Sequence, residues 1–181
     1  RGAQRGARGD GDPAAVTRHP LAIAALCSAL LCLHAWFFDH MADDAYITLR
    51  YLDHWLRGDG LVFNRGEWVM GFSNPLWLVA LAPLGLAGVD LPGAARGLGL
   101  ALSIACVVLV CHESARRQGH WAAALAAGGW LAASGPFALW SQAGLEGPLF
   151  ALCLAGAVIA AGRAAESPSR STIVCLCLAI A

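Results

Sequence analysis

The chain has 181 residues, of which 58% are hydrophobic and only 13% are charged. A soluble domain carries about 25% charged residues, so this composition indicates a membrane protein. Twelve basic and twelve acidic residues leave no net charge, which excludes a general electrostatic attraction to nucleic acid.

The N-terminal residues 1–19 are rich in glycine, alanine and arginine and predict a disordered cytoplasmic tail. The apolar run from Pro20 to Phe38 follows, and as a helix of about 28 Å it can cross the hydrocarbon core. A cleaved signal peptide is the alternative, but the run is too long for one and no small-residue cleavage site follows it. The arginines before the run predict a cytoplasmic N-terminus.

A polar stretch, DDAYITLRYLDHWLRGDGLVFNRGEWVMGFSNPLW, extends from Asp43 to Trp77 and holds five of the twelve acids. Its apolar residues recur at helical spacing from Asp44 to Arg57, which predicts an amphipathic helix along the membrane surface. Asp43 is the predicted N-cap and Gly58 the predicted end. Adjacent carboxylates beside aromatic residues and arginines suggest a site, although capping of the helix is the simpler alternative.

The apolar segment from Pro75 to Val89 decides the topology. As a helix it would measure about 22 Å, and it contains Pro83 and two glycines. If the segment crosses the membrane, seven of the twelve arginines lie outside; if it does not, eight lie inside. Only the second arrangement obeys the positive-inside rule. We therefore predict a re-entrant or surface helix within an outer loop, residues 39–96, and we expect Glu146 on the outer face.

Three more apolar runs, Gly93–Cys111, Trp121–Trp140 and Pro148–Gly162, predict membrane helices. The seven cysteines all lie in apolar segments and lack the spacing and histidine partners of a zinc site. Because the chain begins without Met and stops within an apolar run, we expect the N-terminal part of a larger protein. The predicted fold is all-α: residues 20–181 form part of a polytopic membrane helical bundle with amphipathic juxtamembrane helices in its first outer loop.

A second acidic position lies far from the first in sequence. Glu146 stands in GLEGPLF, a glycine-flanked turn directly before a predicted membrane helix. Its simpler interpretation is an acid that favours the start of that helix. Because Glu146 and the Asp43–Asp44 pair are both expected on the outer face, a joint site becomes the stronger interpretation.

The stretch from Asp43 to Trp77, followed later by GLEGPLF, resembles the polytopic membrane glycosyltransferases of the C superfold (GT-C). These include protein mannosyltransferases, aminoarabinose transferases and oligosaccharyltransferase catalytic subunits. The pattern DDAYI, GLVFN, GE and NPLW is most similar to bacterial members such as terminal arabinofuranosyltransferases. The resemblance covers about residues 20–165. It departs at Trp68 and Met70, where we expect charged residues in relatives, so no substrate contact is carried over to these two positions.

The resemblance implies transfer of a sugar from a polyprenyl-phosphate donor to a glycan, lipid or protein acceptor at the outer face of the cytoplasmic (inner) membrane. In the family, acids of the first and second outer loops form the catalytic centre, and these match Asp43 or Asp44 and Glu146. A carboxylate can take the proton of an acceptor hydroxyl, and a leaving phosphate needs arginine or a metal. The predicted substrate contacts are Arg50, His54, Arg65 and Asn74.

Three questions stay open on the sequence. A divalent metal is neither implied nor excluded, because two adjacent acids offer too few ligands for a confident site. A transporter or channel subunit could use acids at the mouth of a helix to bind a coupling ion. A non-catalytic membrane scaffold would need neither Asp43 nor Asp44.

Overall fold

The computed structural model describes residues 13–166, and side chains from residue 20 onward. Helices make up every regular element of this part of the chain, as predicted. They are α1 (Pro13–Phe38), α2 (Asp43–Leu56), α3 (Pro75–Leu86), α4 (Leu91–Gln118), α5 (Trp121–Ala133), α6 (Gly135–Ser141) and α7 (Gly147–Glu166). The apolar run expected after residue 170 and the first part of the predicted tail lie outside the described residues.

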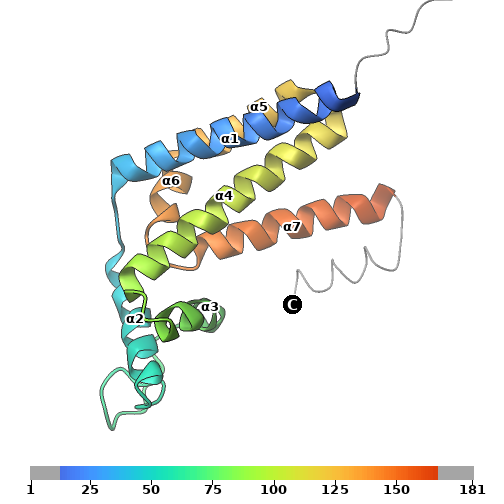
Figure 1. Cartoon of the computed structure of the whole chain (residues 1–181). Coiled ribbons are helices and arrows are strands. Elements are labelled where there is room, and N and C mark those ends of the chain that lie inside the picture. Colours follow the sequence, from blue (N-terminus) through green and yellow to red (C-terminus); the bar gives the residue numbers. More distant parts are fainter. Residues whose placement is uncertain (1–12, 167–181) are drawn as a thin grey trace, which may run out of the picture.

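Three helices are long and apolar enough to cross a membrane: Pro20–Phe38 of α1, all of α4 and all of α7. α4 packs against α1, α5 and α7, and is the central helix of the bundle. Figure 1 shows that α1 ends, and that α4 and α7 begin, on the same side of the bundle. Residues 13–19, which we expected in the tail, instead belong to α1. The hydropathy pattern does not reach this segment, and the helix continues across Pro20, which removes one of its backbone hydrogen bonds.

The predicted single helix Trp121–Trp140 is wrong, because α5 and α6 are bent by 66° at a break. The break follows from Ser134, Gly135 and Pro136. Pro136 has no N–H to donate to the Ala132 carbonyl, so α5 cannot continue through it, and Ser134 caps the new helix by accepting a hydrogen bond from the Phe137 amide at 3.5 Å. The pair is one broken span or a re-entrant loop, so the described residues hold three to four candidate spans.

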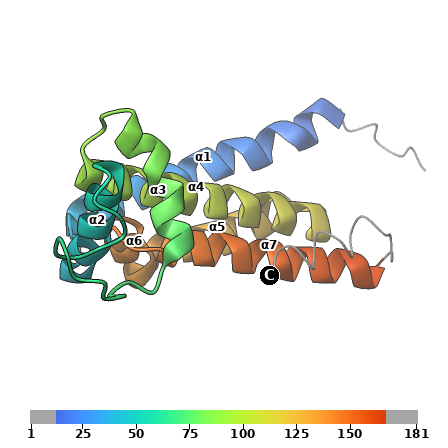
Figure 2. The ribbon, with the colours of Figure 1, turned by 90° about the horizontal axis from the view of Figure 1, so that it is seen from below.

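The short helices α2 and α3 lie together at one end of the bundle (Figure 2). α2 is amphipathic and buries Ala45, Thr48 and Leu52 on one face. Its N-cap is Ala42, so the prediction of Asp43 as the cap is wrong; Asp43 instead begins the first turn. The helix stops where predicted, since Gly58 follows it with a φ of 86°, a conformation that favours glycine.

α3 has 12 residues, about 18 Å of helix, which is too short to cross a hydrocarbon core of about 30 Å. Trp77, Leu78 and Leu81 of α3 are fully buried in a hydrophobic cluster shared with α2 and the first turns of α4. α3 therefore closes the end of the bundle, as expected for a helix that does not span. A second cluster joins α1, α4, α5 and α6.

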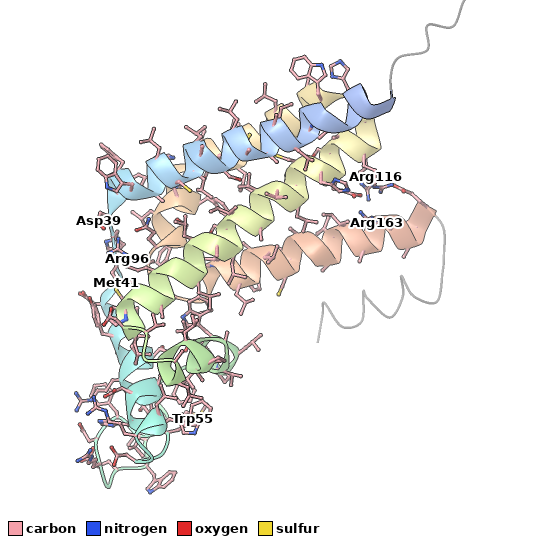
Figure 3. All side chains as sticks on the ribbon, in the orientation of Figure 1. Asp39, Met41, Trp55, Arg96, Arg116 and Arg163 are labelled. Atoms are coloured by element: carbon pink, nitrogen blue, oxygen red, sulfur yellow. The ribbon has the colours of Figure 1, made fainter. Side chains whose placement is uncertain are left out.

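Charged side chains mark the two ends of the bundle. Asp39 and Arg96 pair at the end that carries α2, whereas Arg116 and Arg163 lie at the opposite end (Figure 3). The predicted outer loop and the predicted inner arginines are therefore at opposite ends of the helices.

Candidate functional site

A chain of hydrogen bonds connects α2 to the turn before α7. The Thr48 hydroxyl donates to Asn74 Oδ1 at 3.0 Å, and Asn74 Nδ2 donates to Glu146 Oε2 at 2.7 Å. Thr48 and Asn74 are buried, while Glu146 is half-buried. A buried amide with both its oxygen and its nitrogen engaged has a defined orientation. Asn74 therefore directs the Glu146 carboxylate toward the α2 end of the bundle.

The turn that carries Glu146 is docked on the start of α2. The Ala42 amide donates to the Ala143 carbonyl at 3.0 Å, and Trp77 Nε1 donates to the Gly144 carbonyl at 3.0 Å. Gly144 has a φ of 80°, and a Cβ added there would meet Ala45 Cβ at 3.0 Å. Only glycine allows this turn to approach α2 so closely. Residues far apart in sequence are thereby brought to one place.

Asp43 and Asp44 lie in the first turn of α2 and are both exposed. Side chains four residues apart are neighbours on a helix, so Asp44 stands one turn before Thr48, on the side of α2 that faces Asn74. The Asp43 side chain points about 100° around the helix axis from that of Asp44. It lies on the same face of α2 as Arg50, two turns later. The two acids are therefore not equivalent, and Asp44 is the one on the Glu146 side.

The predicted contacts Arg50 and His54 hold the loop between α2 and α3. Arg50 Nε donates to the Phe63 carbonyl at 2.7 Å, and its guanidinium lies 4.7 Å from the centre of the Phe63 ring. His54 Nδ1 is 2.9 Å from the Val62 carbonyl. Arg65 pairs with Asp59 at 2.9 Å in the same loop. These three side chains thus bind the loop, and the structure does not bring them to Glu146.

Arg50 also lines an open hollow of about 640 Å³ on the far side of α2. Asp53 and Asp90 line it too, together with the Tyr46 and Phe63 rings. Asp53 is paired with Arg57 at 2.9 Å, so Asp90 is the carboxylate that offsets Arg50 here, and Arg50 Nε is already bonded to the Phe63 carbonyl. Arg50 is therefore not well placed to compensate a leaving lipid phosphate.

Arg96 is a cation near the Glu146 turn that the sequence analysis missed. It donates to Gln142 Oε1 at 2.6 Å and forms an ion pair with Asp39, so it ties α4 to the end of α1 and to the turn before α7. Its side chain is 34% exposed, which leaves the guanidinium accessible. A lone arginine at the start of a long apolar helix was the signal that could have identified it.

No group of three or more histidine, cysteine, aspartate or glutamate side chains among residues 13–166 could hold a metal ion. Five cysteines of the described part are free thiols, namely Cys27, Cys32, Cys106, Cys111 and Cys153, and the remaining two lie outside it.

A second charged cluster, also missed, lies at the opposite end. The Glu113 side chain is buried, with 6% exposed, and accepts hydrogen bonds from Arg116, Arg117 and Arg163 at 2.7 to 2.8 Å. Arg163 comes from α7, so the cluster joins the ends of α4 and α7. A glutamate that sits three and four residues before two arginines was the signal in the sequence.

Comparison with known protein families found no match, and comparisons with curated proteins and with solved structures found none that is significantly similar.

Proposed function

We propose that this chain is part of a polytopic membrane glycosyltransferase that moves a sugar from a polyprenyl-phosphate donor to an acceptor hydroxyl. The observation that carries the proposal is the hydrogen-bonded chain from Thr48 through Asn74 to Glu146. It orients one carboxylate beside the turn of α2 that carries Asp44. An exposed carboxylate at the start of α2 and a second one, held by a buried amide on the turn docked there, suit acid–base chemistry on hydroxyl groups.

In the proposed reaction Asp44 takes the proton of the acceptor hydroxyl. At the same time the oxygen of that hydroxyl bonds to the anomeric carbon of the donor sugar. The bond from that carbon to the phosphate oxygen breaks, and the lipid phosphate leaves with the electron pair. Glu146 accepts hydrogen bonds from sugar hydroxyls and so positions the reacting groups. Arg96 compensates the charge on the leaving phosphate, which takes the place of its exposed partner Asp39.

The proposal places this site on the outer face of the cytoplasmic membrane, with the N-terminus inside. Its support is the count of arginines along the chain. With the N-terminus inside, eight of the twelve arginines lie on the cytoplasmic side, among them Arg116, Arg117 and Arg163, and four lie on the outer side, all within residues 39–96. An excess of arginine marks the cytoplasmic side of membrane proteins.

The proposal is tested by sugar transfer in membranes that contain the whole protein. Asp44→Asn removes the base while it preserves the size of the side chain, so transfer is expected to be abolished at normal protein levels. Asp43→Asn is the matched control, because Asp43 lies one residue away on another face of α2. Full activity in both variants would exclude catalysis by this loop, and loss in Asp43→Asn alone would move the base to Asp43.

A further inference from the structure

An open groove lies between α4 and α5, at the end of the bundle that carries the arginines. It encloses about 850 Å³. Arg117, Gln118 and His120 line its mouth, and the small side chains of Ala126 and Ala127 form part of its wall. A groove with a polar mouth and an apolar wall suits a ligand that is itself divided into a polar and an apolar part.

The charged cluster beside the mouth has a net positive charge. Glu113 and Glu166 pair with Arg116, Arg117 and Arg163, so three arginines against two glutamates leave one positive charge, and of these five side chains Arg117 lines the groove. Arg117 is fixed there, because its Nε is 2.8 Å from Glu113 Oε1 and its Nη1 is 3.0 Å from Glu166 Oε1. The guanidinium also lies close over Gly162 of α7, where a side chain would displace it.

His120 adds a hydrogen-bond donor to the mouth. Its Nδ1 accepts from the Ala122 amide at 3.0 Å, so in the neutral ring the proton is on Nε2. The Nε2–H group, the Gln118 amide and the Nη2 group of Arg117, which is the guanidinium nitrogen not bonded to Glu113 or Glu166, are donors on residues that line the same groove. Such a set matches the oxygen atoms of a phosphate diester, which only accept hydrogen bonds.

The apolar wall has the length of one lipid leaflet. From His120 to Leu131 α5 extends about 16 Å, which is half of a hydrocarbon core of about 30 Å. Trp130, near the far end of the wall, is 83% exposed in the structure. An acyl chain whose headgroup is held at the mouth would therefore reach the Trp130 ring.

We propose that this groove binds an anionic phospholipid of the surrounding membrane. The phosphate contacts Arg117, Gln118 and His120, and one acyl chain lies along α5 as far as Trp130. Basic pockets between membrane helices are suited to anionic headgroups. This site goes beyond the proposed transferase activity and does not depend on it, since it lies at the opposite end of the bundle from Glu146.

The test uses the whole protein in vesicles of phosphatidylcholine and phosphatidylglycerol. Two preparations are compared, one with bromine on the acyl chains of phosphatidylglycerol and one with bromine on those of phosphatidylcholine. The ratio of the two lipids is the same in both. Brominated chains quench tryptophan fluorescence on contact, and the signal of Trp130 is the difference between the wild type and Trp130→Phe. One net positive charge predicts that brominated phosphatidylglycerol quenches Trp130 about fivefold more than brominated phosphatidylcholine does.

Two substitutions separate the groove from general contact with lipid. Ala126→Phe fills the groove and is expected to remove the excess quenching, whereas Ala133→Phe, on the same face of α5 but beyond the groove, is expected to preserve it. His120→Ala, which leaves the glutamate–arginine cluster intact, is expected to reduce the preference for phosphatidylglycerol. Equal quenching by the two lipids would overturn the proposal, as would an excess that survives Ala126→Phe. Absence of quenching by either lipid would show that protein covers the groove and would overturn it too.

Discussion

Asn74 and Glu146 are 72 positions apart in the sequence, and the side-chain amide of Asn74 donates a 2.7 Å hydrogen bond to the carboxylate of Glu146. The same amide accepts from Thr48 through its oxygen. Asn74 directly precedes α3, so this one buried side chain links α2, α3 and the turn before α7. The geometry of the proposed site depends on it.

Asn74→Asp is expected to destabilise the protein, because it replaces the donor to Glu146 with a second carboxylate of the same size. The cost of a lost buried hydrogen bond is about 1–3 kcal/mol, so Tm in detergent should fall by several degrees. Asn64→Asp is the control: Asn64 makes the same kind of bond to Glu67 at 3.0 Å, but in an exposed loop. If both substitutions lower Tm by a similarly small amount, the bond to Glu146 contributes no more to stability than an exposed one.

Glu146→Gln is expected to lower sugar transfer by about 100-fold or more, the effect of one positioned acid–base or orienting group. The amide has the size of the carboxylate but no negative charge, so sugar hydroxyls lose an acceptor. Glu67→Gln, in the exposed loop, should leave transfer unchanged. Transfer rates in membranes at equal protein levels measure both. Near-normal turnover of Glu146→Gln would leave Glu146 with a structural role alone.

The proposed orientation can be tested by labelling single cysteines with a reagent that does not cross membranes. Asp59→Cys lies in the loop after α2 and is expected to be labelled from outside. Gln118→Cys ends α4 at the arginine end and is expected to react only after the membrane is opened. Labelling of position 118 from outside would reverse the orientation and remove the site from the outer face.

Glu113→Gln is expected to destabilise the joint between α4 and α7, because three arginines lose the carboxylate that they share. The loss of hydrogen bonds to a buried charged group costs roughly 2 kcal/mol, and Tm in detergent should fall accordingly. Glu166→Gln is the matched control, since the Glu166 side chain is 53% exposed and surface pairs contribute little. If the two substitutions shift Tm equally, burial of Glu113 is not what stabilises the joint.

The sequence by itself determined the elements whose signal is local. A long apolar run such as Pro20–Phe38 predicts a membrane helix, because every backbone polar group must be satisfied within the helix in lipid. The helical spacing of apolar residues after Asp44 predicted α2, and Gly58 its end. The shortness of the Pro75–Val89 segment predicted a short helix, and α3 has 12 residues. In each case the residues that decide the outcome are neighbours in the chain.

The tertiary structure decided what depends on residues far apart. The docking of the Glu146 turn on α2 decided that the face of α2 carrying Asp44, and not the one carrying Asp43, lies on the Glu146 side. The contacts of Arg50, His54 and Arg65 with their own loop, and the position of Arg96 near Gln142, depend on where α4 and α6 lie. The bend at Ser134 was predictable from Pro136, but the prediction of one helix used only the length of the apolar run. Hydrogen bonds such as those of Asn74 form only once the helices have packed. Hydropathy and periodicity therefore cannot predict them.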